Sequence, residues 1–351
     1  MHWSKTRSRA RFNLATSGVA PCPLDALPVD RAAFEINGDN SYGYELLQTA
    51  IAQHCGVDPA CVVEAAGAAM ANHLAMASLL EPGDEVLIEK PTYSLIPDTA
   101  RYLGADIKRF ERAEANGWAV DPAQIARVIT PRTRLVVMTN LHNPTSVLTP
   151  DRVLRQVGEL ARSVGAAVLV DEVYLDLIYE GTPRTSFHLG EEFVVTSSLT
   201  KAYGLSGLRC GWVLARPELA WRMRRLNDLF GATPVHVAEL ISVVAFKHLP
   251  FLRDRARHIV EADRRLLDDF FARESALSVV RTESGTTAFP RLRHGMSEGL
   301  VQRLRTEFET SVVPGAFFEM PEHFRIGWGV ETAVFAEGLK RIRQALASPS
   351  A

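Results

Sequence analysis

The stretch SSLTKAYGLSGLRCGW, residues 197–212, concentrates side chains that could do chemistry. It offers Ser198, Thr200 and Lys201 within one turn, and Arg209 follows the lysine by eight residues. The preceding run EEFVVT is apolar and predicts a buried strand. A strongly hydrated ammonium is unusual at such a strand end. Lys201 is therefore either a solvated loop lysine or a nucleophile that forms a Schiff base with a carbonyl compound.

Small and polar residues also follow the neighbouring predicted strands. They are Gly67, Ala68 and Ala69 after CVVEA, Tyr93 after EVLIE, Asn143 after RLVVMTN, and Asp171 and Tyr174 after AAVLV. Each alone has an ordinary explanation, as a turn residue, a core aromatic or a helix cap. The carboxyl ends of parallel strands meet at one sheet edge, however, and ligands bind there. The set is therefore expected to form one site.

One half of this set suits a phosphate. The helix that begins after Gly67 would present backbone N–H groups and the positive end of its dipole. Ser198 and Thr200 add hydroxyl groups, and Arg209 adds a forked positive charge. The sequence therefore predicts that this end of the site holds a phosphorylated ligand.

The other half suits the ring of a phosphorylated aromatic aldehyde. Tyr93 could stack on the ring face, and Asp171 could keep a pyridine nitrogen protonated, a pairing typical of pyridoxal phosphate enzymes. Asn143 and Tyr174 could donate hydrogen bonds to a phenolate oxygen. Lys201 could then move a proton between the substrate Cα and the cofactor.

The elements that must position these residues alternate between strands and helices. Near-continuous apolar strands of this kind predict an α/β fold with a mostly parallel sheet covered by helices on both faces. TPDRVLRQVGELARSVG predicts a helix with Thr149 as N-cap and Pro150 at its first position. From Pro217 onward, helices and short strands predict a smaller α+β domain. We expect a large cofactor-binding domain at residues 39–250, and a small domain from residues 1–38 and 251–351.

The composition limits the classes of protein to which the chain can belong. Its 351 residues are 47% hydrophobic and 23% charged, with a formal net charge of −2. No basic excess is available for nucleic acid or a membrane surface, and no run reaches the roughly 18 apolar residues of a membrane helix. The four cysteines lack metal-ligand spacing, so we expect a cytoplasmic protein without a metal site. The basic start, residues 2–11, lacks a signal peptide's apolar run and is interpreted as an exposed arm.

Several pieces of the chain resemble, in order, the class I/II aminotransferases, the aspartate-aminotransferase-like branch of fold-type I pyridoxal phosphate enzymes. These pieces are YGYELLQTAIA, EAAGAAMANHLA, EPGDEVLIEKPTY, NLHNPTS, LVDEVY, SSLTKAYGLSGLRCGW, VVPGAFF and FRIGWG. The similarity spans nearly the whole chain, and the lysine segment with Arg209 is its most specific part. The resemblance implies pyridoxal 5′-phosphate as cofactor and a homodimer with sites at the subunit interface.

The resemblance also implies a role for individual residues. Lys201 corresponds to the Schiff-base lysine and Asp171 to the partner of the ring nitrogen. Tyr174 and Asn143 correspond to the phenolate ligands, and Tyr93 to the stacking aromatic. Ser198, Arg209 and the amides of Ala68 and Ala69 would bind the phosphate. Arg325 matches the arginine that binds the substrate α-carboxylate. Gly18 matches the family's entry-segment glycine near that carboxylate.

The chain departs from the family pattern at two places. Gly38 stands at the spacing of the tyrosine that usually reaches the partner subunit's phosphate, so we assign that role to Tyr42, which directly precedes Gly43. The asparagine loop reads HNPTS where the family more often has a glycine after the threonine, and His142 is interpreted as a structural residue.

The expected function is transfer of an amino group between an L-amino acid and a 2-oxo acid through the Lys201 Schiff base. A lyase, cyclase or synthase acting on an amino acid with the same fold is the alternative, because a fold does not fix the reaction. A cofactor-sensing DNA-binding regulator is disfavoured, since the chain has neither spare length nor a basic excess.

Overall fold

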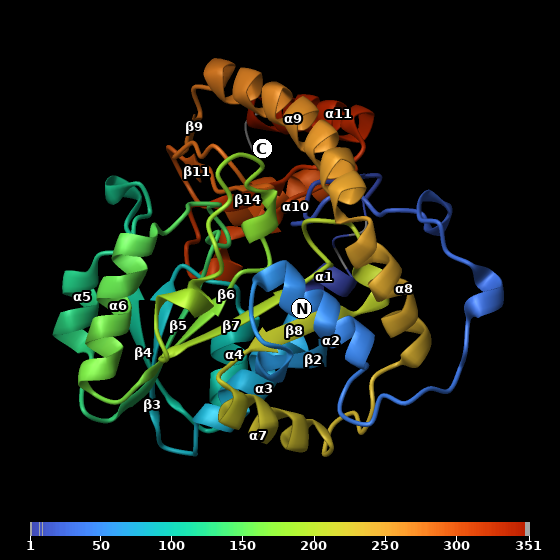
Figure 1. Ribbon diagram of the computed structural model, residues 1–351. Helices are drawn as coiled ribbons and strands as arrows, with labels where there is room; N and C mark the ends of the chain where they lie inside the picture. The colour runs from blue at the N-terminus through green and yellow to red at the C-terminus, as the bar shows by residue number, and fades with distance from the viewer. Residues whose placement is uncertain (1, 7, 9, 348–351) are drawn as a thin grey trace.

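A seven-stranded sheet forms the centre of the protein (Figure 1). The computed structural model describes residues 2–6, 8 and 10–347. The sheet has the order β2-β8-β7-β6-β5-β3-β4, and its neighbours run parallel except β8, which is antiparallel to β2 and β7. Its strands are β2 Val62–Ala66, β3 Glu85–Lys90, β4 Asp106–Glu111, β5 Thr133–Thr139, β6 Ala167–Asp171, β7 Phe193–Ser198 and β8 Cys210–Leu214. The predicted mostly parallel α/β sheet is confirmed.

Helices cover both faces of this sheet, as predicted. Side chains alternate between faces along a strand, so Val137 packs toward α3, α4 and α7, whereas Val136 packs toward α5 and α6. Toward the β2 edge, α2 and α8 cover the second face. The bounds are α2 Glu45–Cys55, α3 Ala68–Leu79, α4 Leu95–Tyr102, α5 Pro122–Val128, α6 Asp151–Ser163, α7 Pro217–Asn227 and α8 His236–Lys247.

The C-terminal third carries the long helix α9 and a set of short strands around the start of the chain. These elements are α9 Leu249–Arg273, β9 Leu277–Ser278, β10 Thr287–Ala288, β11 Arg291–Leu292, α10 Ser297–Glu307, β12 Thr310–Ser311, β13 Val313–Pro314, β14 Phe324–Gly327 and α11 Thr332–Ala347. β1, Phe12–Asn13, pairs in parallel with β12. The N-terminal segment therefore finds its strand partner in the C-terminal part, as expected. The domain boundaries remain a prediction.

The start of the chain packs against the protein at Trp3 and Ser8, whereas Lys5, Thr6 and Arg11 are exposed, so the interpretation as an exposed arm holds only in part. α1 spans His2–Thr6, and the Trp3 ring lies edge-on to Phe317 with 5.7 Å between ring centroids. Ser8 is buried, and its carbonyl accepts a hydrogen bond from Ser311. Residues 7 and 9, which contribute to the basic character of this segment, lie outside the described residues.

The predicted start of α6 is also off by one residue. The helix begins at Asp151, and its N-cap Pro150 has extended dihedral angles. The Thr149 hydroxyl accepts a hydrogen bond from Arg112 and does not cap the helix. A tertiary contact thus replaces the local cap at this position.

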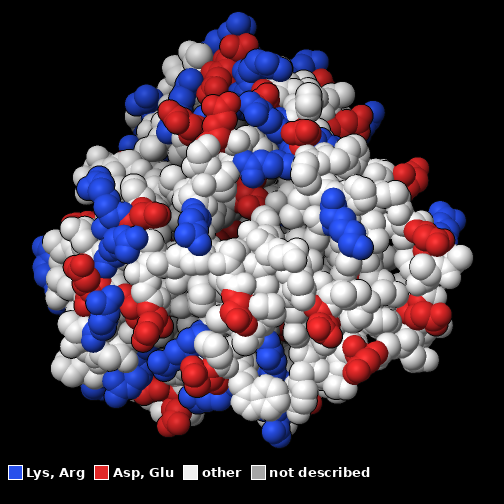
Figure 2. Space-filling model, in the orientation of Figure 1, with Lys and Arg blue, Asp and Glu red and all other residues white. Residues whose placement is uncertain are grey.

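The surface mixes charges of both signs. Figure 2 shows Lys and Arg side chains interspersed with Asp and Glu around the periphery of the visible face, whereas its middle is mostly uncharged, in keeping with the net charge of −2. Within the described residues, we find no helix whose length and apolar character would let it cross a bilayer.

Candidate active site

A cavity of about 330 Å³ opens at the carboxyl ends of the central strands, a size typical of small-molecule sites. It contains ten of the twelve predicted site residues, and Gly18 and Tyr42 are the two outside it. The lining residues are Ala15, Thr16, Ser17, Ala68, Ala69, Asn72, Tyr93, Leu95, Thr139, Asn143, Asp171, Val173, Tyr174, Ser198, Thr200, Lys201, Arg209 and Arg325. Residues far apart in the sequence thus meet at one sheet edge, as the strand pattern predicted.

Lys201 lies in this cavity just beyond the end of β7. Its Nζ donates a hydrogen bond to Ser17 Oγ at 2.9 Å. Burial lowers the pKa of Lys201 to about 8, helped by Arg325 and opposed by the Asp171 carboxylate. A lysine with this pKa carries a substantial neutral fraction near neutral pH, which is what a nucleophilic amine requires.

Gly18 lies against the backbone of Lys201 and does not line the cavity. A Cβ at this position would meet Lys201 Cα and Cδ at 3.0 Å. The Val19 amide donates to the Lys201 carbonyl at 2.9 Å, which joins the two segments. The glycine thus allows the N-terminal segment to approach the lysine closely. Its predicted proximity to the substrate carboxylate remains a prediction.

Asp171, at the end of β6, is held by a residue that the sequence analysis missed. Asn72 Nδ2 donates to Asp171 Oδ2 at 2.8 Å, and Asn72 Oδ1 accepts from Thr196 at 2.6 Å. Burial raises the pKa of Asp171, while Asn72, the Val173 amide and Lys201 oppose that rise. A carboxylate in this environment favours a cationic partner, such as a protonated ring nitrogen.

Arg325, on β14, also lines the cavity. Its Nη1 donates to Asn143 Oδ1 at 2.9 Å and its Nη2 to the Ala15 carbonyl at 3.0 Å. Its Nε has no hydrogen-bond partner among the described residues. Burial lowers the pKa of Arg325 and raises that of Tyr93 to about 12. Arg325 is therefore a buried cation with donor capacity left for an anionic ligand.

The start of α3 forms a cradle with Arg209. Gly67 has φ 80°, and a Cβ on it would lie 2.1 Å from Arg209 Nη2. Only a glycine therefore allows the guanidinium to cross the helix start, where Nη2 donates to the Ala66 carbonyl at 2.9 Å. The buried Thr200 hydroxyl has no hydrogen-bond partner in the described part of the chain. The first amides of α3 likewise have no intrahelical acceptor. Such a donor set fits a phosphate group.

The family model of aminotransferase class I and II matches residues 37–342. The chain belongs to this family. Members of the family use pyridoxal phosphate, so this is the cofactor of the protein. The cavity agrees with that assignment, because a phosphate cradle, a buried carboxylate and a lysine of lowered pKa surround one space.

Relatives in the family carry names of more than one reaction. The chain is 31% identical to capreomycidine synthase of Streptomyces vinaceus, over 98% of this chain and 92% of the relative. A pyridoxal phosphate-dependent aminotransferase of Streptococcus suis 89-1591 superposes with a TM-score of 0.92 at 27% identity, covering 98% and 96% of the two chains. The pyridoxal phosphate-dependent cyclase OrfR superposes with a TM-score of 0.85 at 26% identity, covering 95% and 92%.

Tyr42 lies on the protein surface, away from the cavity of its own chain. Tyr42 is 42% exposed, and its ring centroid lies 5.0 Å from that of the half-exposed Trp221. The contact of Tyr42 with a partner subunit stays a prediction.

Proposed function

We propose that this protein is a pyridoxal phosphate-dependent aminotransferase that moves an amino group between an L-amino acid and a 2-oxo acid. The observation that carries the proposal is that the half-buried amine of Lys201 and the buried guanidinium of Arg325 share one cavity with the buried carboxylate of Asp171. The lysine supplies an amine that is partly neutral, and the arginine supplies a fork for an α-carboxylate. An amino acid substrate needs the arginine to hold its carboxylate and the amine to take the proton from its Cα.

Lys201, Asp171 and Arg325 each have a distinct task in this proposal. When bound, pyridoxal phosphate joins its aldehyde to an amine and withdraws electrons from the adjoining carbon. The Lys201 amine, held by Ser17 and partly neutral, would take the proton from the substrate Cα. Asp171 favours a protonated ring nitrogen because the carboxylate stabilises a cation. Arg325 holds the carboxylate and so selects the Cα bond that reacts.

The charges in the cavity also bear on the substrate. Among the described lining residues, the charged side chains are Asp171, Lys201, Arg209 and Arg325, and each already has a task. A second carboxylate on the substrate would find no further cation among these described lining residues, and an unpaired buried charge is costly. We therefore propose that a donor with a second carboxylate, such as aspartate or glutamate, would need a further cation from the partner subunit.

A cyclase or synthase reaction is the second candidate. It is supported by the likeness to capreomycidine synthase over nearly the whole chain and by the likeness to the cyclase OrfR. The same residues could serve it, since such a reaction also begins with removal of the Cα proton. The two candidates differ in whether the amino group leaves the substrate.

We also propose that the protein acts as a homodimer. Large apolar side chains are exposed just before α2, on α2, on α7 and on the loop between α7 and α8: Tyr42, Leu46, Trp221, Leu229, Phe230 and Val235. Figure 2 shows few charged side chains over α2 and α8. Exposed apolar surface of this kind is typical of a subunit interface.

The decisive experiment mixes the holoenzyme with single amino acids and no acceptor. Transamination predicts a stoichiometric change of the cofactor spectrum to the aminated form, together with one equivalent of 2-oxo acid. Addition of a 2-oxo acid should then restore the original spectrum. A cyclised product that keeps its amino group would instead support the second candidate, and continuous release of ammonia would indicate a lyase; either result would overturn the first candidate.

A further inference from the structure

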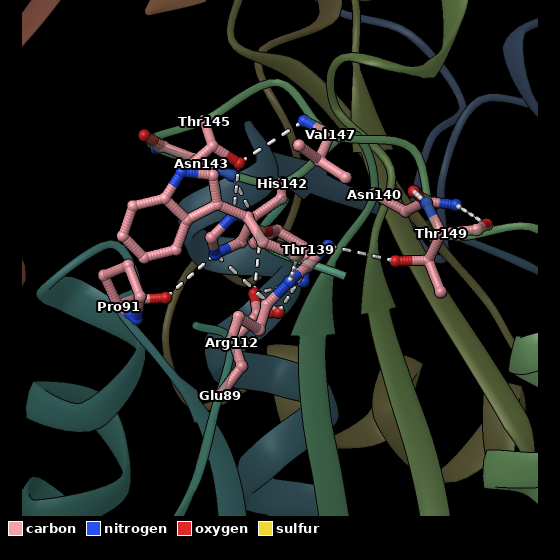
Figure 3. A network of polar contacts seen from close by, with 11 residues as sticks. Glu89, Pro91, Arg112, Thr139, Asn140, His142, Asn143, Thr145, Val147 and Thr149 are labelled. Carbon is pink, nitrogen blue, oxygen red and sulfur yellow. Dashed lines mark hydrogen bonds and ion pairs between the residues drawn. The ribbon is translucent and has the colours of Figure 1, made fainter. Parts of the chain in front are cut away.

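A buried ion pair lies beneath the loop that carries Asn143 (Figure 3). Arg112 Nη1 donates to Glu89 Oε2 at 2.9 Å, and both side chains have no exposed surface. Removal of two charges from water costs free energy that their attraction only partly returns, so an apolar pair would often stabilise a fold as well. Stability alone is therefore a weak explanation for this pair.

The Glu89 side of the pair determines where the backbone of Asn143 lies. Glu89 Oε1 accepts hydrogen bonds from the Thr139 amide at 2.7 Å and from the Thr139 hydroxyl at 2.8 Å. The same hydroxyl oxygen accepts a hydrogen bond from the Asn143 amide at 3.0 Å. Glu89 thus orients Thr139, and Thr139 holds the first turn of the loop.

The Arg112 side closes the base of the loop at residues 140–149. Arg112 Nε donates to the Trp118 carbonyl at 2.7 Å, and its Nη2 donates to Thr149 Oγ1 at 3.4 Å. The Thr149 amide donates to Asn140 Oδ1 at 2.9 Å, and Asn140 Nδ2 donates back to the Thr149 carbonyl at 3.3 Å. The loop is therefore fixed at both ends by groups that contact the ion pair.

His142 links this loop to the segment that leads to Tyr93. Its Nε2 lies 2.9 Å from the Pro91 carbonyl, which can only accept, so Nε2 carries the proton. Its Nδ1 then accepts from the Thr145 hydroxyl at 2.7 Å. Burial holds the pKa of His142 well below its ordinary value, so the ring is neutral. These contacts favour the structural role predicted for His142.

We propose that Glu89 and Arg112 are positioning residues of the active site. Through Thr139 and the loop base they keep Asn143 Oδ1 at 2.9 Å from Arg325 Nη1. That contact engages the oxygen of the amide and leaves Nδ2 as the group that can donate to the cofactor ring oxygen. The inference rests on the proposed function, which gives Asn143 and Arg325 their tasks.

The test compares Glu89→Gln with the matched control Glu85→Gln in the holoenzyme. Glu85 is a buried carboxylate on the same strand, paired with Lys108 at 2.6 Å, but stands at the opposite end of β3 from the cavity. Three quantities are measured: the unfolding midpoint, the pH titration of the cofactor's visible absorbance, and the affinity for a non-reactive monocarboxylate, read from the same absorbance.

Glu89→Gln should move the midpoint of the absorbance titration and weaken carboxylate binding on the order of tenfold, the scale of effect seen when outer partners of a positioned ligand are removed. Glu85→Gln should alter only the unfolding midpoint. If Glu89→Gln yields no folded protein, Arg112→Lys takes its place, because it keeps a charge beside Glu89 and loses the forked donors to Trp118 and Thr149.

An unchanged titration and an unchanged carboxylate affinity in the folded variant would overturn the proposal, whatever the loss of stability. Neither readout needs turnover. A wild-type holoenzyme that binds cofactor and carboxylate but transaminates no amino acid would therefore refute the proposed function and leave this positioning test intact.

Discussion

The lowered pKa of Lys201 predicts how the apoenzyme attaches its cofactor as pH changes. The ordinary pKa of a lysine is 10.5, and burial, with Arg325 nearby, lowers that of Lys201 to about 8. At pH 7, roughly 9% of the Lys201 amine is then neutral, against roughly 0.03% for an unshifted lysine. At pH 7 the neutral, reactive fraction of Lys201 is therefore about 300-fold larger than that of a lysine with an unshifted pKa.

The attachment rate should rise with pH because the neutral amine is the species that attacks the cofactor aldehyde. The attachment rate should rise about 50-fold between pH 6 and pH 8 and then only about twofold up to pH 10. A lysine of ordinary pKa would instead gain about 75-fold between pH 8 and pH 10. Arg325→Leu removes a cation that lowers the pKa of Lys201, so the inflection of this variant should move to higher pH.

Stopped-flow absorbance of apoenzyme mixed with pyridoxal phosphate measures this rate directly. Nα-acetyl-lysine in the same buffers is the control, because the titration of the cofactor itself affects both reactions equally. The reasoning is refuted if the enzyme and the free lysine analogue keep a constant rate ratio up to pH 10.

Three further substitutions test individual residues of the site. Asp171→Ala should lower kcat by about 100-fold or more, as loss of a preorganised electrostatic partner does elsewhere; near-normal kinetics would count against its role. Arg325→Leu should reduce kcat/KM for amino acids by ~10²-fold or more, because a buried charge partner is worth about 2–5 kcal/mol. Cofactor affinity should stay within a few-fold, and its loss would mean that Arg325 serves the cofactor. Gly18→Ala should lower the free energy of unfolding by about 1–3 kcal/mol and slow cofactor attachment, since its Cβ would meet Lys201 at 3.0 Å. Gly299→Ala, where no atom lies within 4 Å, is the control, and equal unfolding free energies for the two variants would contradict the close approach.

The strand pattern was sufficient to predict the sheet edge and most of the site. Apolar runs such as FVVTS and LVVMT are continuous because both faces of the sheet are covered. The residues that follow them therefore meet at one edge, and Asp171, Asn143 and Lys201 line one cavity. The antiparallel direction of β8 had no signal in its own apolar run, because periodicity does not encode strand direction.

The supporting residues could not be predicted, since their partners are distant in the sequence. Asn72 is an interior residue of α3, and its contact with Asp171 spans 99 positions. Ser17 reaches Lys201 across 184 positions. For Glu89 the sequence does indicate a buried polar partner, because a glutamate inside the mostly apolar strand EVLIEK needs one. The identity of that partner, Arg112, depends on how β3 and β4 lie side by side.

Borohydride reduction of the holoenzyme tests the central assignment most directly. Reduction fixes a lysine-bound cofactor permanently to its side chain, and mass spectrometry of the peptides then locates it. The chain has six lysines, namely Lys5, Lys90, Lys108, Lys201, Lys247 and Lys340, so the position is unambiguous. The account predicts one modified residue, Lys201, and no fixation in Lys201→Ala. A cofactor fixed to any other lysine, or retained in Lys201→Ala, would contradict it.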